Sequence, residues 1–108
     1  MSMRPEVFSM KSETRGSMRR LAVTGEIDLS TSARVRACFD RMLGDAQTVE
    51  VDLRGVTFMD SSGAHLLAYM RGRAGGGLWV IPSAAVVRLL RLARPLPESG
   101  RVVLVRDG

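Results

Sequence analysis

The sequence is poor in the residues that most often build metal sites and covalent cross-links. Cys38 is the only cysteine and His65 is the only histidine. An intramolecular disulfide is therefore excluded, and a zinc site made of cysteine and histidine ligands cannot be assembled. We expect neither a metal nor a cofactor.

Long hydrophobic runs are also missing. No window reaches the roughly 18 consecutive apolar residues that a membrane-spanning helix requires. Residues 1–10 contain no apolar run of the length found in a signal peptide. We therefore expect a cytoplasmic protein with no membrane partner.

Aromatic residues make up only 5% of the chain, although basic residues outnumber acidic ones by 16 to 11. The net charge of +5 would suit a nucleic-acid partner, but the arginines are scattered from Arg4 to Arg106. Their densest group, Arg88, Arg91 and Arg94, is equally typical of the solvated face of a helix. Because few aromatic side chains are available to stack on bases, direct nucleic-acid binding is not favoured.

The composition and the apolar periodicity predict one α/β domain. With 108 residues, 45% of them hydrophobic and 25% charged, we expect a single domain over 1–108 with a core at about 7–105. The element order β-β-α-β-α-β-α-β predicts a mixed, mostly parallel β-sheet of about five strands, covered by helices. The expected strands are 7–10, 18–24, 48–53, 78–81 and 101–105, and the expected helices run from an N-cap among Ser30–Ser32 to Gly44, from Asp60 to near Gly72 and from Pro82 to Ala93.

Local signals set the expected boundaries within this order. The polar segment 12–17 predicts the turn of a hairpin, Gly25 is expected to end the second strand, and Arg54-Gly55 is expected to break the third. The continuous apolar run 78–81 is typical of a central strand covered on both faces.

Chemistry is concentrated where the third strand leads into a helix. Asp60, Ser61, Ser62 and Gly63 follow one another there, and Asp60 is a good N-cap. The free N–H groups of a helix start would favour a phosphate on Ser61 or Ser62, whereas the Asp60 carboxylate would oppose it. The residues alone leave open a simpler interpretation, in which Asp60 and the serines merely cap the helix.

Enzyme functions are less well supported. His65 lies four residues after Ser61, which would put both on one helix face, but no acid is obviously placed to orient the imidazole. The pair Glu26 and Asp28 is better explained as a loop entering a helix than as an acid–base pair. The nucleophile elbow G-x-S-x-G, the Walker A loop and G-x-G-x-x-G are all absent from the sequence.

Two segments together carry a family resemblance. Gly25-Glu26-Ile27-Asp28 after an early strand and Phe58-Met59-Asp60-Ser61-Ser62-Gly63 after a middle strand resemble the two signatures of the STAS domain, best known in bacterial anti-sigma factor antagonists. The resemblance extends over roughly residues 7–105. It implies a regulatory binding protein and not an enzyme.

The resemblance also implies a switch. The serine after the aspartate is the phosphoacceptor of that family, which corresponds to Ser61. The implied partner and kinase is an anti-sigma factor with a histidine-kinase-like ATPase fold. The unmodified antagonist binds it and frees the sigma factor, phosphorylation releases it, and a phosphatase resets the switch. The expected partner-binding residues are Asp28, Asp60, Ser61, Ser62 and Gly63.

The sequence departs from the family at its C-terminus. The family usually continues into a helix after the last strand, whereas this chain reads Arg106-Asp107-Gly108 there. We expect a homodimer or a partner helix to cover the exposed flank. The alternative function on the same fold is a STAS subunit of a lipid or solute transport assembly, or a scaffold of a stress-signalling particle.

Overall fold

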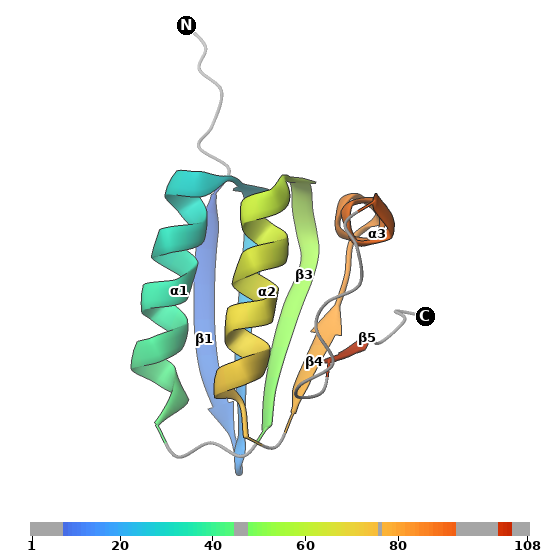
Figure 1. Ribbon diagram of the computed structural model, residues 1–108. Coiled ribbons are helices and arrows are strands. Elements are labelled where there is room, and N and C mark those ends of the chain that lie inside the picture. Colours follow the sequence, from blue (N-terminus) through green and yellow to red (C-terminus); the bar gives the residue numbers. More distant parts are fainter. Residues whose placement is uncertain (1–7, 45–47, 76, 93–101, 105–108) are drawn as a thin grey trace, which may run out of the picture.

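The protein forms a mixed β-sheet with helices packed on it (Figure 1). The computed structural model describes residues 8–44, 48–75, 77–92 and 102–104. In the described residues the sheet is five-stranded with the order β1-β2-β3-β4-β5. The elements are β1 (Ser9–Arg15), β2 (Met18–Ile27), α1 (Leu29–Leu43), β3 (Thr48–Met59), α2 (Ser61–Arg73), β4 (Leu78–Ile81), α3 (Ala84–Leu92) and β5 (Val102–Leu104).

The sheet is parallel except at one edge. β1 pairs antiparallel with β2, and the pairs β2–β3, β3–β4 and β4–β5 are all parallel. The predicted α/β class and the predicted element order are therefore confirmed. Residues 7, 93, 101 and 105, where predicted elements began or ended, lie outside the described residues.

The core lies between the sheet and the helices α1 and α2, and α3 adds the buried Val86 to it. Alternate side chains of β2 and β3, such as Leu21, Val23 and Val51, are buried because period-two alternation places them on the same face. The apolar stripe of α1 brings Phe39 into the same cluster. Each such side chain contributes about 1.5–3 kcal/mol on burial, which holds the helices in fixed positions on the sheet.

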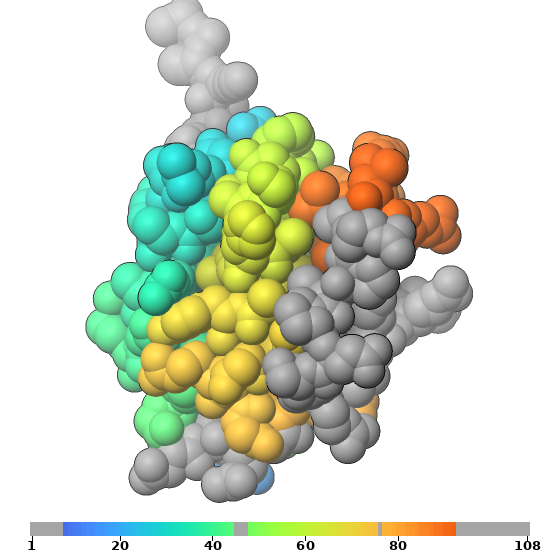
Figure 2. All heavy atoms as spheres, in the orientation of Figure 1, coloured from blue at the N-terminus to red at the C-terminus, as the bar shows by residue number. Residues whose placement is uncertain are grey.

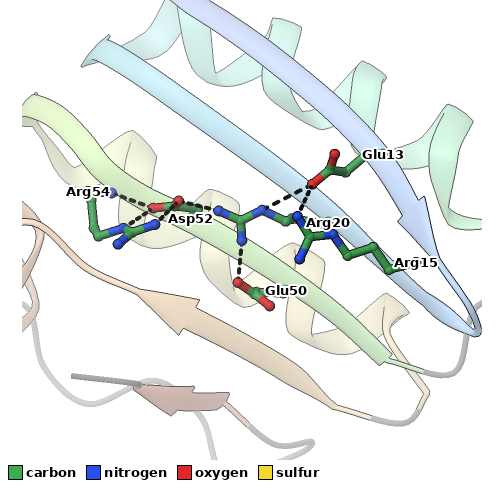
Figure 3. Close-up of polar contacts among 6 residues, drawn as sticks. All are labelled: Glu13, Arg15, Arg20, Glu50, Asp52 and Arg54. Atoms are coloured by element: carbon green, nitrogen blue, oxygen red, sulfur yellow. Dashed lines mark hydrogen bonds and ion pairs between the residues drawn. The ribbon is translucent and has the colours of Figure 1, made fainter. Parts of the chain in front are cut away.

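The opposite sheet face is polar at its centre. Figure 3 views this face, with the helices behind the sheet and Arg20 lying between acidic side chains of neighbouring strands. In β4, Leu78 and Val80 are buried whereas Trp79 is 41% exposed. The expectation of a strand covered on both faces is therefore wrong for the described residues, because a continuous apolar run does not reveal which face is covered.

Two expected boundaries in the first part of the sheet are wrong. The segment 12–15 belongs to β1, so the hairpin turn is only Gly16-Ser17, with Gly16 at φ 62°. β2 continues past Gly25 to Ile27. Pairing with neighbouring strands overrides the local turn preference at both places.

The third strand also continues where a break was expected. β3 runs through Arg54-Gly55, and its register with β2 shifts at two points. A Cβ at Gly55 would lie 2.5 Å from the Thr24 side chain, so glycine permits the close approach of the strands here. Beyond these irregularities β3 continues to Met59, and Asp60 follows at the edge of the sheet.

Candidate functional site

Two helix starts lie side by side at the carboxyl edge of the parallel strands. β2 leads into α1 and β3 leads into α2, and the last residues of the two strands, Ile27 and Met59, are paired. The Asp60 N–H donates to the Ile27 carbonyl at 3.2 Å. This pairing brings the predicted residues Asp28 and Asp60–Gly63 to one edge, although 31 residues separate Asp28 from the second group.

Asp28 caps α1, which corrects the expectation of a hydroxyl cap among Ser30–Ser32. Its carboxylate accepts from the Thr31 N–H at 3.0 Å, and the Asp28 N–H donates to Thr31 Oγ1 at 2.8 Å. These two bonds form a reciprocal capping box. The hydrogen bond from the Thr31 backbone, assisted by the Ser30 hydroxyl, lowers the pKa of Asp28, so the carboxylate is held in its charged form.

Asp60 caps α2 as predicted, and it also engages the second serine. Its carboxylate accepts from the Ser62 N–H at 2.9 Å and from the Ser62 hydroxyl. The Gly63 N–H donates to the Asp60 carbonyl at 2.9 Å. The Ser62 hydroxyl is therefore committed to the Asp60 carboxylate.

Ser61 differs from Ser62 in its surroundings. It is the first residue of α2, and it is exposed. Within the described ranges its hydroxyl has no hydrogen-bond partner, whereas the Ser62 side chain is partly buried and bonded to Asp60. Of the two serines, Ser61 is the one whose hydroxyl an incoming molecule can reach without breaking a bond.

Gly63 is buried against the strand that precedes the helix. A Cβ at this position would lie 2.3 Å from Met59 Cγ and 2.6 Å from Met59 Sδ. The sequence left open whether Gly63 admits a partner's backbone or packs against the sheet. The contact with Met59 accounts for the glycine by internal packing.

Exposed apolar side chains border the site and were not predicted as site residues. Leu29, immediately after Asp28, is 78% exposed, and Phe58, two residues before Asp60, is 47% exposed. Their signal in the sequence was an apolar residue at the border of each family signature. Large apolar side chains beside charged groups are common at protein–protein contacts.

A groove between α1 and α2 opens beside the same edge. Its walls include Leu29, Ser32 and Arg36 from α1 and Ser62, His65 and Tyr69 from α2, and its volume is about 250 Å³. We call it the α1–α2 groove. Figure 2 shows the surfaces of the two helices next to each other on this face of the molecule.

The geometry offers little for other kinds of site. His65 is exposed, and in the part of the chain that the structure describes it makes no hydrogen bond to Ser61 or to a carboxylate. Across the described ranges, no three His, Cys, Asp or Glu side chains gather where they could hold a metal ion. Among these residues we find no helix with the length and apolar character needed to cross a membrane.

Comparison with known proteins assigns the chain to a family. The family model described as "Mlab, STAS domain" matches residues 10–95. The chain belongs to the STAS domain family. No curated protein matches its sequence.

Two solved structures show which proteins this chain is similar to. An anti-sigma factor antagonist from Mycobacterium paratuberculosis has a TM-score of 0.72 and 25% identity, covering 79% of this chain and 76% of that one. The anti-sigma factor antagonist SpoIIAA in its unphosphorylated form has a TM-score of 0.62 and 26% identity, covering 78% of this chain and 79% of that one. Both of these structural neighbours are anti-sigma factor antagonists.

Proposed function

We propose that this protein is an anti-sigma factor antagonist. It binds a kinase-type anti-sigma factor, thereby releases a sigma factor in the bacterial cytoplasm, and is switched off by phosphorylation of Ser61. The observation that carries the proposal is the unengaged Ser61 hydroxyl at the start of α2, beside a Ser62 hydroxyl held by Asp60. The similarity to two anti-sigma factor antagonists supports the same role.

The helix start can accommodate a phosphate. The first N–H groups of α2 and the positive end of its dipole favour an anion on Ser61. The nearby Asp60 carboxylate opposes it, since a phosphate adds about 1.5 to 2 negative charges. Modification therefore changes the local field sharply without requiring the helix to unfold.

The proposed contact surface is Asp28, Asp60, Ser61 and Ser62, with Gly63 supporting α2 from beneath through its packing on Met59. Both aspartates are N-caps, so their positions are fixed by backbone hydrogen bonds. A partner that fits this rigid edge would meet new charge and bulk when Ser61 is phosphorylated. Loss of affinity then needs no other conformational change.

The first experiment tests the phosphoacceptor. Each kinase-fold anti-sigma factor of the host is purified and incubated with this protein and radiolabelled ATP. We expect one of them to phosphorylate the wild type and Ser62→Ala, and to leave Ser61→Ala unlabelled. Label on Ser61→Ala at the wild-type level would refute Ser61 as the acceptor.

The second experiment tests the switch and the alternative function. A pull-down from the host compares the wild type with Ser61→Asp, and we expect the wild type to retain the anti-sigma factor and Ser61→Asp to retain less of it. Transporter subunits held equally by both forms would instead support a STAS subunit of a transport assembly. Homodimer formation stays a prediction, which sedimentation velocity of the purified protein tests.

A further inference from the structure

Tyr69 lines the α1–α2 groove, and several contacts hold its side chain in place. The Tyr69 hydroxyl donates to the Asp40 carboxylate at 2.8 Å and accepts from Arg73 Nη1 at 2.8 Å. The Tyr69 ring also packs edge-to-face against the buried Phe39, with the ring centroids 6.5 Å apart. These contacts fix the ring before any partner arrives, so the groove is preorganised.

Among the residues that line the groove, Arg36 brings a positive charge and none brings a carboxylate, while the carboxylates of Asp40 and Asp60 lie just outside the lining, bonded to Tyr69 and Ser62. Arg36 contributes a guanidinium that lies 3.9 Å from the centroid of the Tyr69 ring, and His65 lies on the opposite helix. Among the described residues, no acidic side chain lies within ion-pair distance of Arg36. A guanidinium that is stacked on an aromatic ring keeps its N–H donors available for a carboxylate.

The groove is otherwise lined largely by apolar side chains and opens beside the switch serine. Leu66 and Ala33 contribute to its lining, and the exposed Leu29 forms part of the same wall next to Asp28. Ser62, the neighbour of Ser61, lies on the α2 wall. A ligand in the groove would therefore extend from the Arg36–Tyr69 stack to the start of α2.

We infer that the α1–α2 groove is the docking site for a segment of the anti-sigma factor that carries an apolar side chain next to a carboxylate. The apolar side chain packs against Leu29 and the carboxylate pairs with Arg36. This inference rests on the proposed function.

Charge complementarity selects this occupant. A second copy of this chain carries a net charge of +5, which disfavours it as the ligand of a groove whose lining includes Arg36 and no carboxylate. An acidic segment gains from both the arginine and the apolar wall. A few well-packed, desolvated residues, with arginine and tyrosine prominent among them, supply most of the affinity at protein interfaces.

The test measures the affinity of the purified variants for the anti-sigma factor that the wild type binds. Leu29→Ser and Arg36→Ala are each expected to weaken binding by at least about fivefold. Leu92→Ser is the matched control for the first, because Leu92 is 75% exposed on α3, away from the groove. Arg41→Ala is the control for the second, because Arg41 is an exposed arginine of α1 that is absent from the groove lining.

The outcomes separate this inference from the proposed function. Loss of affinity in both groove variants, with unchanged controls and unchanged thermal unfolding, supports the docking site. Wild-type affinity of Leu29→Ser and Arg36→Ala, together with weak binding of Ser61→Asp, overturns the docking site and leaves the proposed function standing. If the wild type binds no kinase-fold anti-sigma factor of its host, the proposed function fails and the docking site fails with it.

Discussion

The substitution Gly63→Ala adds one methyl group and tests how α2 packs on Met59 next to Ser61. In Gly63→Ala the new Cβ would overlap Met59, which must move or force α2 away from β3. Overpacking of this kind costs about 1–3 kcal/mol, and the higher helix propensity of alanine offsets up to about 1 kcal/mol of it, so we expect a net fall in the free energy of unfolding in a denaturant titration.

The same helix provides the control for this substitution. Gly72 of α2 is exposed, and a Cβ there would meet no atom within 4 Å. Gly72→Ala is expected to leave stability unchanged or to raise it by up to about 1 kcal/mol through helix propensity. Equal stability of both variants would show that Met59 adapts without cost and that Gly63 has another role.

The role of the Asp28 charge in partner binding can be tested separately from its role as the N-cap of α1. Asparagine caps a helix about as well as aspartate does. Asp28→Asn should therefore keep the unfolding midpoint and weaken binding to the anti-sigma factor, because only the carboxylate is lost. Asp28→Ala should lower both, since it also removes the acceptor for the Thr31 N–H. If Asp28→Asn binds like the wild type, Asp28 is a structural cap and not a partner contact.

At the scale of elements, ion pairs join β1, β2 and β3 on the sheet face opposite the helices (Figure 3). Arg20 of β2 bonds to Glu50 and Asp52 of β3, and Arg54 donates to the same Asp52 carboxylate at 2.8 Å. Asp52 is only 9% exposed. The hydrogen bonds from Arg54, together with the charge of Arg20, lower the pKa of Asp52, although burial opposes them.

The lowered pKa of Asp52 predicts a loss of stability in acid. The pKa of Asp52 in the folded protein lies below its value of about 3.9 in the unfolded chain. The charged carboxylate therefore contributes its full stabilisation at pH values above about 3.9, and this contribution is lost as the pH falls through the folded-state pKa. Asp52→Asn should cost about 2 kcal/mol at neutral pH and should lose less stability on acidification than the wild type does.

Urea titrations at several pH values measure this difference. Glu26→Gln is the control, because Glu26 is exposed and its carboxylate makes no ion pair within the described ranges. If Asp52→Asn and the wild type lose stability in parallel as the pH falls, Asp52 does not contribute through its charge.

The elements also show what the sequence could and could not predict. Helix α1 followed from its apolar spacing, and the start of α2 followed from Asp60, because both depend on neighbouring residues. The length of β3 did not, because its continuation through Arg54-Gly55 depends on pairing with β2. Likewise, the exposure of Trp79 depends on which sheet face the helices cover, and a four-residue apolar strand carries no sign of that.

In the candidate site, too, some features could be predicted from the sequence and others could not. Asp60, Ser61 and Ser62 stood out because a capping residue and two hydroxyls adjoin in the sequence. Only atomic positions show the bond between Ser62 and Asp60, which leaves Ser61 as the one of these two serines whose hydroxyl is unengaged. The α1–α2 groove joins residues such as Arg36 and Tyr69 that are 33 positions apart, and only the packing of two helices places them together.

At the scale of the whole molecule, a switch by direct exclusion must leave the fold unchanged. Ser61→Asp adds a negative charge at the first position of α2, where the helix dipole favours it and Asp60 opposes it. We expect its free energy of unfolding to lie within about 1 kcal/mol of the wild type, while its affinity for the anti-sigma factor falls. Circular dichroism with denaturant and a binding titration on the same samples compare the two quantities. A fall in affinity accompanied by a large loss of stability would mean that the charge acts by disturbing α2, and direct exclusion at the edge of the sheet would then be refuted.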